Sequence, residues 1–254
     1  GAAWRKTRRP IDTDDDGIAD GTGVDLNRNY GHLWGELPGT SHNVWDHNYC
    51  GPSAFSESET HAIRDLANSQ DFTISLSYHT FGQVIYYPWN NGIEVVSPDE
   101  NLLSEIAGGL GARTGYTPMQ GVDAYPTTGD SDDWLYSEGC LPFTIELASE
   151  FQPPVDQIDD ICRKNLDAAL YAIDLANEPE RALLPEWTFM VYMASDADIV
   201  LANEALVDLN EMEVAGSIED LNIVVLYDGQ DNGDSKIYHI QKDINGLDSN
   251  IIST

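Results

Sequence analysis

Two residues within apolar, strand-like segments carry groups that could take part in catalysis. Glu146 lies in the run Phe-Thr-Ile-Glu-Leu at 143–147, where a lone carboxylate is costly unless it is hydrogen-bonded, paired or beside a metal. His79 ends the alternating segment 72–79, and an imidazole there could bind a metal. Taken alone, each residue also fits a structural role, with Glu146 facing solvent and His79 hydrogen-bonded within the fold.

A neighbouring amide and guanidinium could recognise an anion. Asn27 and Arg28 are adjacent and follow the segment 24–26. A guanidinium group presents a planar set of donors that matches a carboxylate, and the amide adds further hydrogen-bonding groups. The pair therefore suits a bound carboxylate, although a surface turn explains it equally well.

Residues 12–20 form an acidic segment with carboxylates at alternate positions. Asp12, Asp14 and Asp16 are followed by a glycine and then by Asp20. This spacing is typical of calcium loops, which bind the ion through oxygen ligands. The segment lacks the distal glutamate of a complete EF-hand, so the sequence predicts at best a partial calcium site. A solvated acidic insertion is the alternative.

The composition of the 254-residue chain restricts its partners. Acidic residues number 44 and basic residues 12, which gives a formal net charge of −32. Nucleic acids and anionic membrane surfaces both attract basic proteins, so we expect neither as a partner. Hydrophobic residues make up 41% of the chain, enough for a folded core rather than disorder. No apolar run is long enough to span a membrane.

Two further features of the composition leave alternatives open. The acidic, lysine-poor chain would stay soluble at high salt, where self-repulsion is screened, but an ordinary acidic secreted protein is equally compatible. Cys50, Cys140 and Cys162 form no Cys-x-x-Cys pair. One disulfide with a free thiol, or no disulfide, fits these cysteines.

Hydrophobic periodicity predicts an α/β framework around the candidate residues. A Ser-x-x-Glu capping box at 56–59 predicts the start of a helix that ends near residue 68. Strands interspersed with helices of this length indicate an α/β sandwich around one sheet. The pattern predicts strands at 72–79, 84–87 and 142–147, and further helices from about 97, at 130–138 and at 155–177.

A change of pattern predicts a second domain. Prolines and charged residues at 179–186 are typical of a linker. The segment 187–254 then reads as the start of another α/β domain, which stops before its sheet is complete. We expect strands at 187–193, 221–227 and 236–240 and a helix at 201–212.

Six sequence blocks occur in the order found in zinc metallocarboxypeptidases. The blocks are Trp4-Arg5-Lys6, 23–30, 51–57, 77–79, 125–134 and 143–147. Residues about 4–177 therefore resemble the carboxypeptidase A/B and T family. The resemblance implies a carboxypeptidase-like domain at 1–178 that lacks its N-terminal part, with a mixed central sheet flanked by helices in an α/β/α arrangement. It also implies a zinc cofactor, secretion to the extracellular space, and peptide or protein C-termini as substrates.

The resemblance also implies catalytic roles. His79 lies where the family has its third zinc ligand, and zinc would polarise the peptide carbonyl and acidify a bound water. Glu146 matches the general base that takes a proton from that water. Arg5 matches the arginine that stabilises the developing oxyanion.

Other positions match groups that bind the substrate. Asn27, Arg28 and Tyr125 correspond to the residues that hold the terminal carboxylate, which implies an exopeptidase. Tyr125 lies on a mobile loop in this family, and Gly121 and Gly129 would suit such motion.

Asp132 is the position that bears on specificity. Family members that cleave basic residues carry an aspartate there, and members that cleave apolar residues carry a branched apolar residue. A carboxylate at the base of the pocket would pair with lysine or arginine, so the resemblance implies a basic preference. The alternative is that Asp132 only caps the following helix.

One departure from the family concerns the metal. The family takes its first two zinc ligands from a His-x-x-Glu segment ahead of the Arg5 block, and this sequence contains no His-x-x-Glu. We expect that segment to precede Gly1 in a longer protein, and this chain alone to bind zinc poorly and be inactive. The alternatives are a non-catalytic relative that binds C-termini and a calcium-stabilised structural module.

Residues about 187–254 resemble the opening of clostripain-like cysteine peptidases. The likeness lies in the strand-like run at 187–193, in two following aspartates, and in the segment 208–213. No cysteine follows Cys162, so this segment is not expected to act as a cysteine peptidase. An unrelated α/β accessory domain is the alternative.

Overall fold

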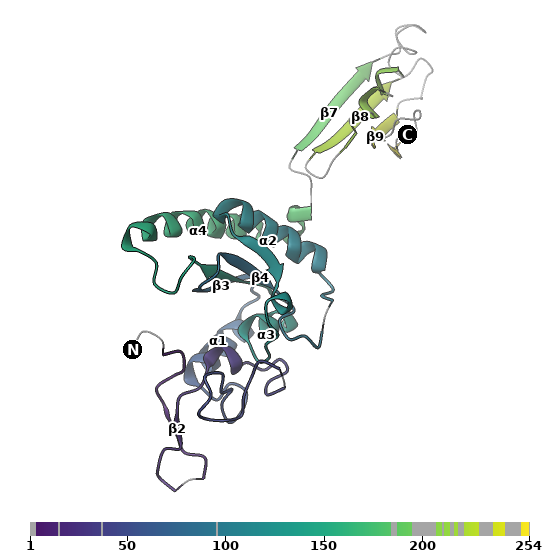
Figure 1. Cartoon of the computed structure of the whole chain (residues 1–254). Helices are drawn as coiled ribbons and strands as arrows, with labels where there is room; N and C mark the ends of the chain where they lie inside the picture. The colour runs from purple at the N-terminus through teal and green to yellow at the C-terminus, as the bar shows by residue number, and fades with distance from the viewer. Residues whose placement is uncertain are drawn as a thin grey trace. The chain divides into compact units, whose positions relative to one another are not determined.

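The chain forms two compact units, Gly1–Ala182 and Leu183–Thr254 (Figure 1). The computed structural model describes residues 4–14, 16–36, 38–94, 96–183, 187–194, 207–209, 211–213, 216–217, 221–228, 236–241 and 250–253.

A four-stranded mixed sheet is the centre of the first unit, in the order β3-β6-β4-β5. β6 is parallel to β3 and antiparallel to β4, and β4 is parallel to β5. The three predicted strands are confirmed, and β5 was not predicted. The strands are β3 (Ile74–Thr80), β4 (Val84–Tyr87), β5 (Thr117–Gln120) and β6 (Leu141–Leu147).

Helices cover both faces of this sheet, as the predicted α/β/α arrangement requires. Figure 1 shows α2 and α4 on one side of the sheet and α1 and α3 on the other. The helices are α1 (Ser58–Ser69), α2 (Glu100–Thr114), α3 (Ser131–Ser137) and α4 (Val155–Leu175), with short 3-10 helices η1 (Leu26–Arg28), η2 (Gly121–Asp123) and η3 (Pro179–Leu183).

The main core lies between the sheet and helices α2 and α4. Alternate residues of β6 point into it, and Phe143 and Ile145 are fully buried. Burial of each such side chain stabilises the fold by about 1.5–3 kcal/mol. The core therefore holds β6 firmly up to the position of Glu146. The α2 side chains that pack there are Leu103, Ile106 and Leu110.

Helix α4 confirms the predicted helix, but most of the apolar repeat that predicted it lies outside the core. The side of α4 that is buried carries mainly small or polar residues, namely Asn165, Ala168, Ala172 and Leu175. More than half of each side chain in the apolar repeat is exposed at Val155, Leu166, Leu170 and Ile173.

The predicted capping box at 56–59 is wrong. Helix α1 begins at Ser58, and Glu57 is its N-cap without a side-chain capping bond. The Glu57 carboxylate is buried and instead accepts hydrogen bonds from Arg9, with Nη2 2.5 Å from Oε1. The Ser56 hydroxyl, which would have capped the helix, accepts from Asn29 Nδ2 at 3.0 Å and donates to Glu57 Oε1 at 3.1 Å.

The acidic segment lies at the tip of a short hairpin. β1 (Pro10–Ile11) and β2 (Gly21–Thr22) pair antiparallel, with Ile11 opposite Gly21. The hairpin therefore presents residues 12–14 and 16–20 as a loop.

The second unit holds another four-stranded sheet, in the order β10-β9-β8-β7. β7 and β8 are parallel, and the other two pairings are antiparallel. The three strands predicted here are confirmed, whereas the predicted helix at 201–212 falls largely outside the described residues. The strands are β7 (Trp187–Ala194), β8 (Leu221–Asp228), β9 (Lys236–His239) and β10 (Asn250–Ser253).

The structure also answers whether the cysteines pair and whether a described helix could cross a membrane. All three cysteines are free thiols; Cys50 and Cys140 are buried and Cys162 is exposed. Within the part of the chain that is described, no helix combines the length and apolar character needed to cross a membrane.

Candidate active site

One cavity of about 250 Å³ in the first unit collects side chains from distant parts of the sequence. Every residue to which the resemblance gave a catalytic, zinc-binding or substrate-binding role lines it. These are Arg5, Asn27, Arg28, His79, Tyr125, Asp132 and Glu146.

Two neighbouring strands deliver the groups at the centre of this cavity. His79 of β3 and Glu146 of β6 are register partners in a parallel pair. Side chains of such partners lie on the same face of a sheet, so the imidazole and the carboxylate project into the cavity together. His79 Nε2 lies 3.1 Å from the hydroxyl of Ser77, two residues earlier on the same face.

Glu146 occupies a setting that disfavours its charge. Burial raises the pKa of Glu146 to about 6, and the positive charge of Arg5 opposes that rise. Glu146 Oε2 is buried and has no hydrogen-bond partner among the described residues. An unpaired buried acceptor is costly, which makes this oxygen available to a ligand or water in the cavity.

The cavity supplies one ligand for a zinc ion, His79, rather than a complete set. Burial lowers the pKa of His79, and Arg5 lowers it further, so the ring is neutral and able to bind a metal near pH 7. Among the described residues, the one group of three or more metal-binding side chains within 4.8 Å of each other is Asp12, Asp14 and Asp20. His79 therefore has no such pair of partners in that part of the chain.

Arg5 is held at the cavity wall by an ion pair. Its Nε donates to Oδ2 of the buried Asp25 at 2.5 Å, while the Arg5 side chain itself is 43% exposed. Asp25 also caps η1, because its Oδ1 accepts from the Asn27 amide at 3.2 Å. One carboxylate thus fixes Arg5 relative to the helix that carries Asn27 and Arg28.

Arg28 is buried with its guanidinium group oriented by backbone carbonyls. Nε donates to the Gly39 carbonyl at 2.8 Å, and Nη1 donates to the carbonyl of Asn27. The Asn27 side-chain oxygen accepts from both the amide and the hydroxyl of Ser131, at 3.0 and 3.1 Å. That link ties η1 to the first turn of α3, where Asp132 lies.

Tyr125 is 56% exposed at the cavity, and the glycines near it serve close packing. A Cβ on Gly121 would lie 1.6 Å from Oδ1 of Asn90. Gly129 has φ +68°, and a Cβ there would lie 2.7 Å from the Arg28 carbonyl. The structure thus explains both glycines by steric need, where the sequence reading had linked them to loop motion.

Asp130, not Asp132, caps helix α3, so the capping alternative for Asp132 is wrong. Asp130 Oδ1 accepts from the amides of Asp132 and Asp133 at 3.1 and 3.0 Å. Asp132 is the second residue of the helix, only 3% exposed, and its Oδ2 accepts from the Thr144 hydroxyl at 2.7 Å. Its carboxylate is therefore free of the helix end and lines the cavity.

The first turn of α3 concentrates buried negative charge. Burial, together with the charge of Asp130, raises the pKa of Asp132 to about 7. The same two causes raise the pKa of Asp133, which accepts from the Asn90 amide and the Asn91 side chain. A cation entering beside Asp132 would compensate this charge.

Several lining residues were missed by the sequence analysis. Thr144 is detectable in principle, because it lies two residues before Glu146 on the same strand face. Asn90 donates to Asp130 at 3.0 Å across forty residues of sequence, and no local pattern indicates that contact. Phe81 and Phe151 also line the cavity, as an edge-to-face pair with centroids 4.5 Å apart.

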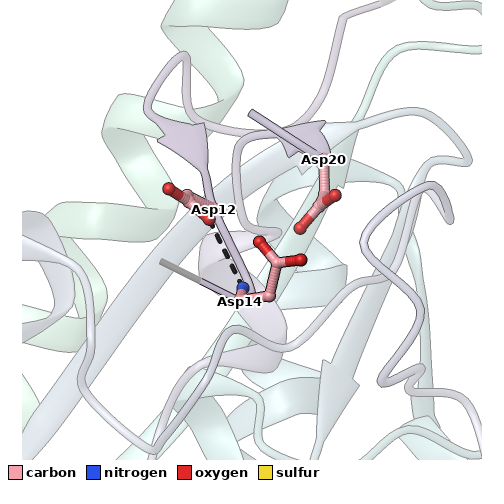
Figure 2. Close-up of side chains that lie close together, drawn as sticks. All are labelled: Asp12, Asp14 and Asp20. Atoms are coloured by element: carbon pink, nitrogen blue, oxygen red, sulfur yellow. Dashed lines mark hydrogen bonds between the residues drawn. The ribbon is translucent and has the colours of Figure 1, made fainter. Parts of the chain in front are cut away.

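The acidic loop forms a separate cluster outside this cavity. Asp12, Asp14 and Asp20 each offer a carboxylate oxygen that lies within 4.8 Å of those of the other two. Figure 2 shows these three side chains and the hydrogen bond that the Asp14 amide donates to Asp12. Asp16, the fourth predicted ligand, is not in the cluster; its Oδ1 accepts from the Ile18 amide at 2.7 Å. The structure thus brings together three of the four predicted residues.

The profile of one protein family, described as zinc carboxypeptidase, matches residues 1–168. The chain belongs to the zinc carboxypeptidase family. Human carboxypeptidase B is 34% identical over 182 residues, which cover 66% of this chain and 42% of that protein. Human carboxypeptidase O is 32% identical over 187 residues, covering 67% and 48%.

Solved structures of zinc carboxypeptidases share the fold. Bovine thrombin-activatable fibrinolysis inhibitor, in complex with tick carboxypeptidase inhibitor, matches with a TM-score of 0.62 and 28% identity, over 69% of this chain and 62% of that one. Carboxypeptidase A from Helicoverpa armigera matches with a TM-score of 0.61 and 25% identity, over 68% and 46%. The chain thus spans under half the length of the curated carboxypeptidases B and O named above.

Proposed function

We propose that this zinc carboxypeptidase domain removes C-terminal residues from peptides and prefers lysine or arginine at the terminus. The observation that carries the proposal is the charge pattern of one cavity. Arg5 and Arg28 line it together with Asp130 and Asp132. A C-terminal basic residue carries the complementary pair, an anionic carboxylate and a cationic side chain.

The terminal carboxylate would bind at Arg28. This guanidinium is buried and pre-oriented by two carbonyls, so little side-chain entropy is lost when it binds an anion. Asn27 and Tyr125 line the same cavity and would complete the grip. Recognition of a free carboxylate would make the enzyme an exopeptidase.

The side chain of the terminal residue would reach Asp132. Binding of a cation there offsets the desolvation that raises the pKa of this carboxyl. An apolar side chain would leave the buried charge uncompensated. The resulting discrimination against apolar termini is the basis of the proposed preference.

Glu146 and Arg5 would act on the bond that breaks. Above about pH 6 Glu146 is ionised, can accept a proton from water, and can pass it to the amine nitrogen as the C–N bond breaks. Arg5 would stabilise the negative charge that develops on the carbonyl oxygen. When bound, zinc supplies polarisation of the carbonyl and a more acidic water.

Zinc binding by this chain alone should be weak. His79 offers one imidazole nitrogen, and a stable zinc site in this class needs three protein ligands. We infer that a segment containing His-x-x-Glu is required in addition, and that the chain alone with added zinc hydrolyses peptides too slowly to detect. Secretion, proposed from the family relationship, is compatible with the acidic composition.

Binding of peptides to the chain tests the proposal without requiring turnover. A short peptide ending in arginine should bind more tightly than its C-terminal amide and than the same peptide ending in leucine, by calorimetry. Asp132→Asn should lower the affinity for the arginine peptide about 10-fold or more and change the affinity for the leucine peptide little. In Arg28→Lys, the affinity for the free-acid peptide should fall close to the affinity for its C-terminal amide.

Two binding results would contradict parts of the proposal. Equal affinity for acid and amide in the folded wild-type chain would remove the exopeptidase assignment. Equal affinity for arginine and leucine peptides would remove the basic preference alone. Asp123→Asn, at an exposed acid outside the cavity lining, is the matched control for Asp132→Asn and should change neither affinity.

Calcium is a second proposed ligand, at Asp12, Asp14 and Asp20. Three carboxylates within 4.8 Å repel one another, and a divalent cation with oxygen ligands would relieve that repulsion. Calcium titration should raise the unfolding temperature of the wild type and not of Asp14→Asn. If calcium leaves the unfolding temperature of the wild type unchanged, the alternative of a solvated acidic loop is favoured. For Leu183–Thr254, the clostripain-like relationship remains a proposal without an assigned site.

A further inference from the structure

The thiol of Cys50 and the imidazole of His42 meet outside the active-site cavity, with Sγ 3.7 Å from Nδ1. We propose that these two side chains form a binding site for a thiophilic divalent cation such as zinc. The site is separate from the metal of the carboxypeptidase reaction and from the acidic loop. It stands on the geometry of its own residues and does not depend on the proposed substrate preference.

The distance between the two ligand atoms suits a metal ion. Zinc binds a cysteine sulfur at about 2.3 Å and a histidine nitrogen at about 2.0–2.1 Å, and a tetrahedral angle then places those two atoms about 3.6 Å apart. The separation of Cys50 Sγ and His42 Nδ1 is 3.7 Å. Sulfur and imidazole nitrogen suit zinc and cobalt, whereas calcium and magnesium prefer oxygen. One ion can therefore contact both atoms with little movement of either side chain.

The ring of His42 presents a lone pair to the thiol. Its Nε2 lies 2.9 Å from the Gly35 carbonyl oxygen, which can only accept, so Nε2 carries the proton of the neutral ring. Nδ1 is then unprotonated and faces the sulfur. Metal-binding histidines are typically oriented in this way, by donation from the other ring nitrogen to a carbonyl or carboxylate. The ring also packs edge-to-face against Trp34, with centroids 5.6 Å apart.

A buried hydroxyl beside the thiol lacks a partner. Thr40 is 5% exposed, and its Oγ1 forms no hydrogen bond within the part of the chain that the structure describes. Burial raises the pKa of the Cys50 thiol, and the Thr40 hydroxyl, which faces the sulfur, lowers it. An unpaired buried oxygen is costly. A cation at the thiol, or a water bound to that cation, would give this oxygen a partner.

Backbone hydrogen bonds hold the ligands together before a metal arrives. The Ser41 amide donates to the Asn48 carbonyl at 3.1 Å, and the Cys50 amide donates to the Ser41 carbonyl at 2.9 Å. Cys50 is thus fixed beside the two neighbours of Ser41, which are Thr40 and His42. Because Cys50 is fully buried and His42 is exposed, an ion would reach the sulfur along the imidazole.

Binding exchanges one proton for one metal ion. The Cys50 thiol releases its proton to solvent and binds the ion as a thiolate, while His42 contributes the Nδ1 lone pair and releases nothing. No electron is transferred, and water fills the remaining positions. The bound ion would brace the segment that orients Arg28, because the Gly39 carbonyl, adjacent to Thr40, accepts from Arg28 Nε at 2.8 Å.

A cobalt titration of the full chain tests the site. A thiolate bound to cobalt gives a near-ultraviolet charge-transfer band that nitrogen and oxygen ligands do not give. None of the three described cysteines lines the active-site cavity, so cobalt at His79 cannot produce this band. The titration uses Cys162→Ser, which removes the exposed thiol. We expect the band to saturate at one cobalt per chain, zinc to abolish it, and calcium and magnesium to leave it unchanged.

Further substitutions in that background test each ligand. Cys50→Ser should abolish the band. His42→Phe keeps a ring beside Trp34 but removes the lone pair, so it should lower the affinity for cobalt about tenfold or more. His47→Phe, at another exposed histidine, is the matched control and should change neither the band nor the affinity.

Three results would overturn the site, with circular dichroism showing that each chain is folded. They are the absence of the band in excess cobalt, a band that survives Cys50→Ser, and an affinity that is unchanged in His42→Phe. If the buried substitution Cys50→Ser prevents folding, the comparison of His42→Phe with His47→Phe decides, because both positions are exposed.

Discussion

His79 and Glu146 are register partners at adjacent positions of the parallel strands β3 and β6. The next pair on the same face, Ser77 and Thr144, is also polar. Partners in a parallel pair stay side by side whatever the surrounding loops do, because the ladder of backbone hydrogen bonds fixes them. The core under Ile145 thus places an imidazole and a carboxylate together with little freedom to separate.

The first prediction concerns the charge of Glu146. The carboxyl should titrate near pH 6 in the folded chain, because burial raises its pKa. Arg5→Gln removes a charge that opposes this rise, so the midpoint should move higher still. Carbon-13 NMR of the glutamate carboxyls measures both values. Arg113→Gln, on the surface of α2, should leave the midpoint in place, and a wild-type midpoint near that of a free glutamate would refute the prediction.

The second prediction concerns stability against pH. The folded pKa of Asp132 is raised to about 7, so between pH 4 and pH 7 the folded state binds more protons than the unfolded state. The free energy of unfolding should therefore fall as pH rises through this window. A rise of about three pKa units at Asp132 corresponds to on the order of 4 kcal/mol over the whole window.

Urea unfolding at pH 5 and pH 8 measures the greater part of that loss. Asp132→Asn should lose less stability between the two pH values than the wild type, because it has no proton to release. Asp156→Asn, at an exposed position of α4, should retain the wild-type difference. Identical pH dependence in the wild type and Asp132→Asn would contradict the raised pKa.

The third prediction concerns the N-cap of α3. Asp130 accepts from two backbone amides, from the Asn90 side chain and from the Thr127 hydroxyl. Asp130→Ala should lower the free energy of unfolding by about 2 kcal/mol or more. Asp130→Asn keeps a capping oxygen and should recover part of the loss, as measured by urea denaturation. Equal stability of both variants would argue against a capping role.

The fourth prediction concerns salt. A net charge of −32 on 254 residues destabilises the compact state by self-repulsion. Since the Debye length shrinks from about 10 Å at 0.1 M salt to about 3 Å at 1 M, the unfolding temperature should rise across that range. Calorimetry in sodium chloride measures it. If the unfolding temperature stays constant or falls as salt is added, self-repulsion of the acidic residues does not destabilise the folded chain, and the prediction is wrong.

Local sequence patterns were enough to place the strands nearest the candidate chemistry. Alternation of side chains is a local property of a strand, so 72–79 and 142–147 predicted β3 and β6 and the positions of His79 and Glu146 within them. The order of six blocks was equally readable from the chain, because each block is short and contiguous.

Tertiary structure decided the contacts between segments. Both Asp130 and Asp132 suit a helix cap, and only the folded backbone shows that Asp130 takes that role. The capping box does not form because the Ser56 hydroxyl is engaged elsewhere: it accepts from the side chain of Asn29, far away in the sequence, and donates to Glu57. Periodicity indicates on which face of its own helix or strand a residue lies. The partner of a charged side chain depends instead on which distant segment the fold brings beside it.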